Sequence, residues 1–342
     1  MLQKVVNEVE KIRILCDYRE MFPSKCEGAL WNDHLPKASF DALAAAVRSK
    51  GHDCDIFGGV PNLIRAYEQK LSFPDTLFLN ASDGMDQPYS RTQIPVLCDM
   101  LKAAYIGCGT FAATLAANKH YTKLAMQEAG IDCPRGLLLT ASTKEEGLRA
   151  IKDSDFPVLL KPNTEGSSLG ITQESVCHSK SELVNRVEEL LSQFEEIEVE
   201  QYVAGFDATD FVIGNPGHFL LNEVLVTQHH GKFFFEKEVL GYAEYLKNDV
   251  TYAGAASYMD QSTIQKIQEI SQRAFCTLGA QDYIRIDYRV TSENQVFLLE
   301  INTVPALKME SQVGTICAIK NWSLGDFCDR LIQAARCRLM CV

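Results

Sequence analysis

Long apolar runs are missing from this sequence. No stretch approaches about 18 apolar residues, so no membrane-spanning helix is expected. The first 18 residues, MLQKVVNEVEKIRILCDY, contain glutamates and no small-residue cleavage site, so we expect no secretory signal. The 12 cysteines include no CxxC pair, and only His229 and His230 are neighbours among the seven histidines. We therefore expect reduced thiols in a cytoplasmic protein, without a structural zinc site.

Basic residues are also fewer than acidic residues. The chain has 33 lysines and arginines against 45 aspartates and glutamates, which gives a formal net charge of -12. General nucleic-acid binding is not expected, because the phosphate backbone would be repelled. An anionic nucleotide would need a local cluster of cations or a metal ion. The hydrophobic fraction of 46% is that of a globular protein, and 342 residues are enough for two or three domains.

The first hundred residues alternate short apolar runs with helical patterns. Strands are expected at residues 11–17, 54–57, 76–80 and 105–106. Helices are expected at residues 39–51, 63–71 and 93–103. Strands that alternate with helices predict an α/β layer with a parallel sheet. We place an N-terminal α/β domain at residues 1–108.

Two further units follow, a central one at residues 109–203 and a C-terminal one at residues 204–342. The central unit should contain helices at residues 115–129 and 181–194 and a strand at residues 198–203. The C-terminal unit should contain strands at residues 211–213, 219–226 and 232–235, a helix at residues 261–278 and an amphipathic helix at residues 324–340. These elements predict a mixed α/β (α+β) fold of three domains.

Residues 155–172, DFPVLLKPNTEGSSLGIT, combine a strand pattern with a flexible loop. Residues 156–160 are a short apolar run, and Lys161 stands at the strand end, where its charge can reach a cleft. Residues 171–172 again look like a strand. The loop between has small residues whose amide and hydroxyl groups can surround an anion: Gly166, Ser167, Ser168 and Gly170. The segment therefore predicts a phosphate lid with a lysine at its base.

Two other interpretations of this loop stay open. Residues 166–170 also fit the GxSxG pattern of a serine hydrolase, which requires a helix directly after the serine. Residues 171–172 do not begin an obvious helix, which disfavours that interpretation. The second alternative is a plain surface hairpin in which Lys161 is a solvated charge.

A weaker signal precedes this segment. Residues 107–112, GCGTFA, fit the GxGxxG/A pattern after a strand, but a dinucleotide fold normally carries that pattern at the first strand of its unit. Lys119 and Lys123 follow, one turn apart on one helix face. They indicate either a solvated face or a pair of anion ligands.

Polar side chains gather on a predicted hairpin at residues 282–302, DYIRIDYRVTSENQVFLLEIN. Alternation places Arg285, Asp287 and Arg289 on one face of the first strand and Leu298, Glu300 and Asn302 on one face of the second. Pairing Asp287 with Glu300 would form one wall of oxygen ligands and a cation, which suits Mg²⁺ with phosphate oxygens completing its shell. So many polar groups are costly unless something binds there. An exposed face of ion pairs is the alternative.

Taken together, these segments resemble the ATP-grasp ligases, specifically the D-alanine–D-alanine ligase family. The resemblance rests on GTFAATLAANKHYTKLAMQEAGI, LLKPNTEGSSLGIT, VEQYVAG, and IRIDYRV followed by LLEINTVP. It covers most of residues 75–320, and the first 70 residues match only in outline. It implies the ATP-grasp fold, with the nucleotide bound between the central and C-terminal domains.

The resemblance implies an ATP-dependent ligase that joins a carboxylate to an amine through an acyl phosphate. Its cofactors would be ATP and Mg²⁺, with Mn²⁺ as a substitute. The ATP-binding residues would be Lys119, Lys161, Glu165, Gly166, Ser167, Ser168, Glu200, Tyr202, Val203, Asp207 and Lys237. The metal ligands would be Asp287, Glu300 and Asn302. Arg285, Ser167 and Lys161 would be catalytic, with Arg285 stabilising the acyl-phosphate and tetrahedral intermediates.

The sequence departs from the family where the family recognises its substrates. Ala306 replaces a glycine, and Lys308 is a candidate for binding an extra acidic group. Ser311 lies where the family uses a serine for the substrate carboxylate, and Glu27 is a candidate for holding the first amino acid. Residues 80–95, with Arg91, differ as well. Because the ATP residues are retained, these changes predict an active ligase with altered specificity.

Small molecules are the expected partners, namely an amino acid or other carboxylate and an amine. The sequence leaves the oligomeric state open, and a homodimer is one candidate. The non-enzymatic alternative is a nucleotide-binding module that has lost turnover. Retention of Arg285 disfavours it, because nucleotide binding alone would not need that arginine. A GxSxG serine hydrolase is the third hypothesis.

Overall fold

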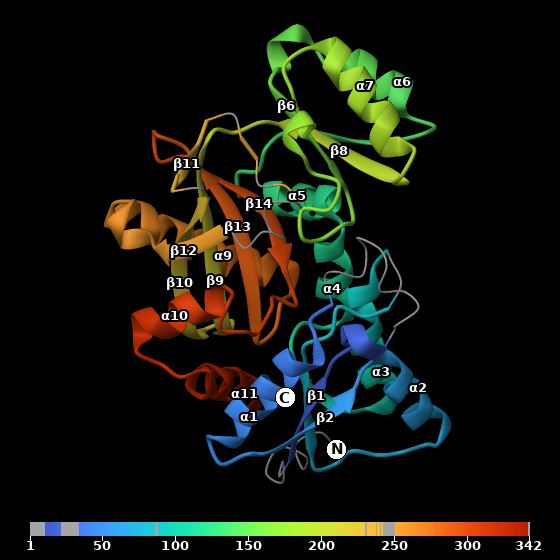
Figure 1. Ribbon diagram of the computed structural model, residues 1–342, viewed down its shortest axis with the longest axis vertical. Helices are drawn as coiled ribbons and strands as arrows, with labels where there is room; N and C mark the ends of the chain where they lie inside the picture. The colour runs from blue at the N-terminus through green and yellow to red at the C-terminus, as the bar shows by residue number, and fades with distance from the viewer. Residues whose placement is uncertain are drawn as a thin grey trace.

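The computed structural model describes residues 11–21, 34–85, 88–229, 231–236, 238–239, 241 and 250–340. Two predicted site residues, Glu27 and Lys237, lie outside these ranges. The described chain contains three sheets, which occupy three regions of Figure 1. No helix within the described ranges is long and apolar enough to cross a membrane.

The first sheet is parallel and has the strand order β2-β1-β3-β4. Its strands are β1 (Lys11–Leu15), β2 (Asp53–Gly58), β3 (Thr76–Asn80) and β4 (Ala104–Ile106). Its helices are α1 (Lys37–Arg48), α2 (Val60–Glu68) and α3 (Gln93–Leu101). All four predicted strands and all three predicted helices are present. Their apolar periodicity identified them because α1, for example, buries Phe40, Leu43, Ala44 and Val47 at helical spacing.

The second sheet is antiparallel, with the order β5-β8-β6-β7. Its strands are β5 (Gly136–Thr140), β6 (Val158–Pro162), β7 (Val176–Cys177) and β8 (Glu196–Gln201). The helices α6 (Lys144–Ala150) and α7 (Lys180–Leu191) pack with it in the upper lobe of Figure 1. Val158 and Leu160 enter the core of this lobe, and Leu159 and Lys161 line a cavity, as alternation predicted. The strand predicted at residues 171–172 is wrong, because the chain returns to β6 only at β7.

The third sheet is the largest, with the order β12-β10-β9-β13-β14 and with β11 paired to β9. Its strands are β9 (Gly205–Asn215), β10 (His218–His229), β11 (Phe234–Phe235), β12 (Val250–Gly254), β13 (Tyr283–Val290) and β14 (Val296–Asn302). Helix α9 (Gln261–Leu278) packs on it and shares its hydrophobic core. The predicted hairpin β13–β14 and the predicted helix α9 have the expected bounds.

The helix predicted at residues 115–129 is instead two helices, α4 (Thr110–Ala117) and α5 (Lys119–Glu128). Asn118 is extended between them, and its side-chain oxygen accepts a hydrogen bond from the Tyr121 amide, so it caps α5. The break turns α5 onto β14 and α9. It thereby brings Lys119 and Lys123 toward the second and third sheets.

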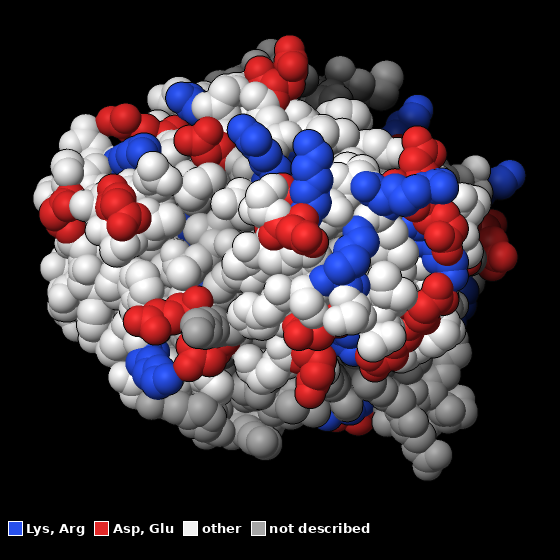
Figure 2. Space-filling model, turned by 90° about the horizontal axis from the view of Figure 1, so that it is seen from above, with Lys and Arg blue, Asp and Glu red and all other residues white. Residues whose placement is uncertain are grey.

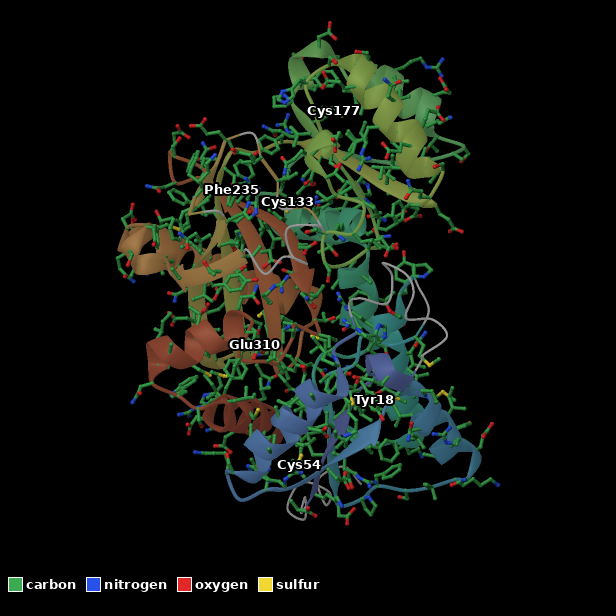
Figure 3. All side chains as sticks on the ribbon, viewed as in Figure 1. Tyr18, Cys54, Cys133, Cys177, Phe235 and Glu310 are labelled. Carbon is green, nitrogen blue, oxygen red and sulfur yellow. The ribbon has the colours of Figure 1, made fainter. Side chains whose placement is uncertain are left out.

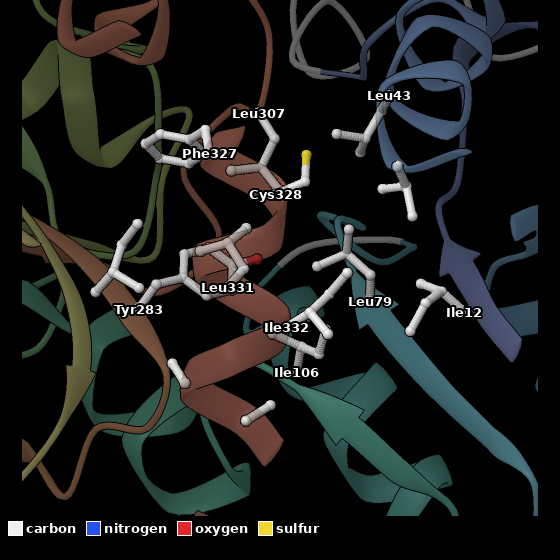
Figure 4. Close-up of a cluster of buried hydrophobic side chains, with 14 of the residues drawn as sticks. Ile12, Leu43, Leu79, Ile106, Tyr283, Leu307, Phe327, Cys328, Leu331 and Ile332 are labelled. Atoms are coloured by element: carbon white, nitrogen blue, oxygen red, sulfur yellow. The ribbon is translucent and has the colours of Figure 1, made fainter. Parts of the chain in front are cut away.

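The terminal helix α11 (Leu324–Met340) lies between the first and third sheets, and α10 (Gln312–Lys320) precedes it. Figure 4 shows Leu331 and Ile332 of α11 between Ile106 and Leu79 on one side and Tyr283 on the other. Below this cluster, buried Asp282 accepts hydrogen bonds from Arg338 and from the Gly107 amide. One carboxylate therefore joins the terminal helix, the first sheet and the third sheet.

Charged residues are mixed on the surface. On the face shown in Figure 2, acidic and basic side chains are interspersed rather than gathered into a stripe of one sign. A basic stripe is the usual footprint of nucleic-acid binding.

Candidate active site

The second and third sheets face each other across a cavity. Nine of the predicted site residues line it: Lys161, Ser168, Glu200, Tyr202, Val203, Asp207, Arg285, Asp287 and Glu300. An adjoining cavity is lined by five more: Lys119, Glu165, Gly166, Ser167 and Asn302. Arg285 and Glu300 line both, so the two cavities are continuous at the hairpin.

A buried ion network forms the second-sheet side of the cavity. Lys161 Nζ lies 2.8 Å from Glu200 Oε1, and Lys123 Nζ lies 2.8 Å from Glu198 Oε2. Lys123 also pairs with Glu200. The side chains of all four are at most 6% exposed. The geometry follows from alternation, because Glu198 and Glu200 share a face of β8 and Lys161 on β6 lies opposite Glu198.

This network keeps its members charged. Burial raises the pKa of Glu198, but Lys123 and Lys161 outweigh it and hold that pKa well below its usual range. Burial likewise opposes the charged form of Lys123. The nearby carboxylates of Glu200 and Glu198 outweigh burial and raise the pKa of Lys123 above its ordinary value. The sequence singled out Lys161 and Glu200 but gave no role to Glu198. Three glutamates, at positions 196, 198 and 200, alternate with Ile197 and Val199 along strand β8, and this alternation was the signal that could have identified Glu198.

The predicted hinge lies at the end of β8. The Tyr202 amide donates to the Pro157 carbonyl over 3.1 Å, and the Tyr202 hydroxyl donates to the Glu238 carbonyl over 2.9 Å. Tyr202 and Val203 line the cavity. Glu200 contributes through its carboxylate, which is held by the two lysines.

A pair of opposite charges crosses β9 and β13 in the same cavity. Asp207 and Arg289 are register partners, and Arg289 Nε lies 2.9 Å from Asp207 Oδ1. The guanidinium also lies over the rings of Tyr202 and Phe235. Figure 3 shows Phe235 at the end of the third sheet nearest the second lobe. Burial raises the pKa of Asp207, and Arg289 opposes that rise.

The hairpin register is the predicted one, with Asp287 opposite Glu300 and Arg285 opposite Asn302. The pairing shifts after Asp287, so that Tyr288 lies opposite Leu298 and Leu299 is the extra residue of a β-bulge. The prediction that Leu298 shares a face with Glu300 is therefore wrong. Leu298 is fully buried in the core, and Leu299 lines the cavity beside Glu300.

Hydrogen bonds hold the side-chain oxygen atoms of Asp287 and Asn302, which lie on the wall of the cavity formed by the hairpin β13–β14. Arg285 binds Asp287 through two contacts of 2.6 and 3.0 Å, and the Thr209 hydroxyl donates to the same carboxylate over 2.8 Å. The Asn302 side-chain oxygen accepts from the Val304 amide over 3.0 Å. Burial raises the pKa of Asp287, which is opposed by Arg285.

Glu300 lies within a group of cations. Its Oε2 is 3.6 Å from Lys119 Nζ and its Oε1 is 4.0 Å from Arg285 Nη2. Burial alone would raise its pKa, but Lys119, Lys161 and Arg285 lower it to about 2. Burial also lowers the pKa of Lys119, and Glu300 opposes that shift. Among these cations, Lys161 also pairs with Glu200 and Arg285 also pairs with Asp287, whereas Lys119 also donates to the Glu165 carbonyl.

The donor set can be compared with the needs of a metal. No group of three or more His, Cys, Asp or Glu side chains placed to hold a metal occurs in the described ranges. Asp287 and Glu300 with the Asn302 amide supply only oxygen donors, from adjacent strands. Mg²⁺ takes few protein carboxylates and completes its octahedron with water and phosphate oxygens, so these residues fit Mg²⁺ bound together with a nucleotide.

The loop between β6 and β7 is a series of turns. Ser167 (φ 49°), Ser168 (φ 58°) and Gly170 (φ 77°) all have left-handed backbone conformations. Arg186 of α7 donates to the Gly170 carbonyl over 2.8 Å, and Lys119 donates to the Glu165 carbonyl. No helix begins directly after Ser168: residues 167–170 form turns, and the next helical segment is the short 3₁₀ turn Gln173–Ser175. The GxSxG hydrolase interpretation therefore lacks the strand-to-helix turn that it requires.

The structure does not bring every predicted residue to these cavities. The Ser311 hydroxyl donates to the carbonyls of Ala306 and Lys308 and caps α10. Neither Ser311 nor Lys308 lines the two cavities. Conversely, the adjoining cavity includes residues of the first sheet's loops that the sequence did not assign: His34, Asp83, Tyr89 and Arg91. Gly107 and Gly109 are structural, because they join β4 to α4 beside Asp282.

Comparisons with known proteins identify the family of the chain. Residues 125–333 match the family described as D-ala D-ala ligase C-terminus. The D-alanine–D-alanine ligase of Desulforamulus reducens is 29% identical over 306 residues, covering 87% of this chain and 92% of that protein. The vancomycin C-type resistance protein VanC2 of Enterococcus casseliflavus is 26% identical over 273 residues, covering 79% of this chain and 74% of its own length.

Solved structures share the fold. The D-alanine–D-alanine ligase from Bacillus anthracis complexed with ATP superposes with a TM-score of 0.72 at 15% identity, covering 96% of this chain and 98% of that one. The VanG D-Ala:D-Ser ligase from Enterococcus faecalis gives a TM-score of 0.71 at 17% identity, covering 95% and 99%.

The fold and the cavity define an enzyme of the ATP-grasp class. The chain belongs to the D-alanine–D-alanine ligase family. It is accordingly an ATP-dependent ligase that forms a C–N bond between small molecules.

Proposed function

We propose that this ligase uses ATP and Mg²⁺ to convert the carboxylate of an amino acid into an acyl phosphate, and then joins the acyl group to the amine of a second small molecule. The observation that carries this proposal is the position of Lys119, which contacts both the lid, at the Glu165 carbonyl, and the carboxylate of Glu300. That lysine joins the phosphate-binding and metal-binding halves of one site.

The cations supply charge neutralisation for phosphoryl transfer, which requires mostly positioning and electrostatic stabilisation. Lys119 and Lys161 bind ATP phosphates, and the amide and hydroxyl groups of Ser167 and Ser168 bind the transferred phosphate. Asp287, Glu300 and Asn302 hold Mg²⁺, for which Mn²⁺ is a substitute. When bound there, the metal would supply charge neutralisation for phosphoryl transfer.

The second half of the reaction is attack of the amine on the acyl carbon. Arg285 stabilises the oxyanion of the tetrahedral intermediate, because its guanidinium is fixed by Asp287 at the junction of the two cavities. Phosphate then leaves. No covalent nucleophile is needed, so Ser168 has no role as one.

The base and ribose of ATP occupy the hinge side of the cavity. The backbone at Glu200, Tyr202 and Val203 binds the adenine edge, and Asp207 accepts a ribose hydroxyl. These residues line one cavity with Lys161, which supports a single nucleotide in contact with all of them.

The substrates are amino acids or close relatives. Relatives are named D-alanine–D-alanine ligase, and one similar structure is a D-Ala:D-Ser ligase, so variation of one substrate occurs among similar proteins. We place D-alanine among the substrates to be tested, with altered specificity for its partner. The enzyme works in the cytoplasm, in keeping with the ten free cysteines in the described part of the chain, and a homodimer is its proposed assembly.

A pairwise amino-acid screen tests the function. Each pair is incubated with ATP and Mg²⁺, release of ADP and phosphate is measured, and products are identified by mass. Amine-dependent ADP release with a product of the summed mass less water is expected. ATP binding without turnover for any pair would instead identify a nucleotide-binding module.

A further inference from the structure

Past the hairpin, toward the first sheet, the adjoining cavity shares lining residues with a third cavity, which has a polar and an apolar end. Asp83, Arg91, Ser167, Arg285 and Asn302 line the polar end, which is shared by both cavities. The far end is apolar and is formed by α1, the residues just before it and the loop after β14: Leu35, Phe40, Leu43, Val304, Ala306 and Leu307. We call this space the substrate chamber.

The Arg91 guanidinium has a hydrogen-bond partner at only one of its three nitrogen atoms in the described part of the chain. Its Nε donates to Asp83 Oδ1 over 2.9 Å. Within the described part of the chain, neither Nη1 nor Nη2 has a hydrogen-bond or ion-pair partner. Arg285 differs, because both its Nε and its Nη2 are bound by Asp287. Arg91 therefore presents a planar pair of donors to the chamber, and such a pair matches a carboxylate.

Hydrogen bonds hold the turn that carries Arg91. Tyr89, in a left-handed conformation, precedes the short 3₁₀ turn Ser90–Thr92, and the Thr92 hydroxyl donates to the Tyr89 carbonyl over 2.7 Å. The Tyr89 hydroxyl accepts from Asn118, the residue that separates α4 from α5. The turn is thus tied to the start of the helix that carries Lys119, so Arg91 has a fixed position relative to the phosphate-binding lysine.

Arg91 lies near the proposed reacting end of the site. It lines the adjoining cavity together with Lys119 and Glu300, and it lines the substrate chamber together with Ser167, Arg285 and Asn302. A carboxylate bound to Arg91 would therefore lie beside the metal wall and the lid. That is the region where a donor carboxylate must meet ATP, or where an acceptor must reach the acyl carbon.

We propose that Arg91, held by Asp83, binds a carboxylate of an amino-acid substrate, and that the apolar end of the chamber accepts a substrate side chain larger than a methyl group. This inference rests on the proposed ligase function and adds a substrate class to it. Both substrates of a ligase that joins two amino acids carry a carboxylate, so the donor and the acceptor are the two sources of this group.

The first test compares Arg91→Gln with the unchanged enzyme on amino-acid acceptors and on the matching amino-acid amides. If Arg91 binds the acceptor carboxylate, the unchanged enzyme should prefer the acid over the amide by about 10- to 100-fold, the usual worth of a charge-assisted pair, and the variant should lose that preference. If Arg91 binds the donor carboxylate, KM for the donor should rise by a similar factor. Unchanged KM values for both substrates would overturn the assignment.

Controls separate a binding defect from a folding defect. Arg65→Gln removes an exposed arginine of α2 in the same region of the chain and should leave KM unchanged. Arg91→Lys keeps the charge but loses the planar donor pair, so its KM should lie between those of the unchanged enzyme and Arg91→Gln. ATP affinity and thermal melting of all three variants should match the unchanged protein. If the melting temperature of Arg91→Gln is lower than that of the unchanged enzyme, the KM values of Arg91→Lys and the unchanged enzyme decide whether Arg91 binds substrate.

The second test narrows the chamber. Ala81, which lines it beside Leu43, is replaced in Ala81→Leu. Activity with leucine-sized or phenylalanine-sized substrates should fall at least about 10-fold relative to activity with alanine, because the added side chain occupies their space. An equal fall for large and small substrates would contradict the chamber assignment. Absence of ADP release from the unchanged enzyme with every pair would instead refute the ligase function itself.

Discussion

Arg289 lies directly opposite Asp207 across β9 and β13, and its guanidinium is packed over Tyr202 and Phe235 at the predicted ribose end of the ATP cavity. Arg289→Met should remove the cation while filling much of its volume. Burial would then raise the pKa of Asp207 unopposed, so that a smaller fraction of this carboxylate is ionised to accept a ribose hydroxyl. We expect ATP affinity to fall about 10-fold by calorimetry, the cost of one charge-assisted hydrogen bond.

The loss of ATP affinity in Arg289→Met should depend on pH. A raised pKa means that Asp207 ionises only as the pH rises through that value, so ATP affinity of Arg289→Met should recover partly in alkaline buffer. Arg330→Met is the matched control, because Arg330 also lies over an aromatic ring, that of Trp322, but on α11 away from the cavity. Equal ATP affinity of Arg289→Met and the unchanged enzyme at every pH would exclude a role for this pair.

The metal assignment makes a separate prediction. Glu300→Gln and Asn302→Ala should each reduce turnover at least about 100-fold, because a ligand position is lost. ATP binding measured without Mg²⁺ should change much less. The pKa of Glu300, lowered to about 2, means that this carboxylate stays ionised above pH 4 and does not supply the acid limb of the pH–rate profile. Glu293→Gln, in the exposed turn of the same hairpin, is the control, and full turnover in both site variants would refute the assignment.

The buried ion network predicts a stability effect. Lys123→Met leaves Glu198 and Glu200 buried with Lys161 as their remaining close cation, which should lower the free energy of unfolding by about 3 to 5 kcal/mol. Denaturant titration measures it. Lys144→Met removes the ion pair with the exposed carboxylate of Glu188 and should cost less than about 1 kcal/mol. Similar values for both variants would mean that the network adds no more than a surface pair.

Much of the third sheet was predictable from local pattern. The hairpin β13–β14 and helix α9 have long periodic segments with clear turn signals, so their bounds and the pairing of Asp287 with Glu300 followed from the sequence. The family resemblance supplied the assignment of Lys119 and Lys161 to one ligand. Lys161 lines the cavity between the second and third sheets, and Lys119 lines the adjoining cavity.

Other features could not be predicted because they depend on distant contacts. The break at Asn118 is stabilised by its cap on α5 and by Tyr89, a residue 29 positions earlier. The bulge at Leu299 changes which side chains face the cavity, and alternation alone cannot locate it. Arg91 and Asp83 join the site only because the first sheet packs against the hairpin end, which no local pattern encodes.

A buried carboxylate outside the active site gives the last prediction. Asp210 lies on β9 between Val224 and Ile286 and is fully buried. Burial raises its pKa from 3.8 to about 7, with the nearby Ser271 opposing the rise. Because the folded-state pKa is raised, the stability that this group contributes is present below pH 3.8 and is lost as the pH rises toward 7. At pH 8 the free energy of unfolding should therefore be about 4 kcal/mol lower than it is below pH 3.8.

Asp210→Asn should remove this dependence, because asparagine has nearly the same shape and no charge to lose. The variant should unfold at a higher denaturant concentration than the unchanged protein at pH 8, and the difference should shrink as the pH falls and vanish below pH 3.8, where Asp210 is protonated in both the folded and the unfolded protein. Asp153→Asn, at an exposed position, should leave the pH dependence unchanged. If Asp210→Asn and the unchanged protein lose stability in parallel between pH 5 and pH 8, Asp210 is not the group that titrates. The pH sensitivity would then have to come from another buried carboxylate, such as Asp287, whose pKa burial also raises.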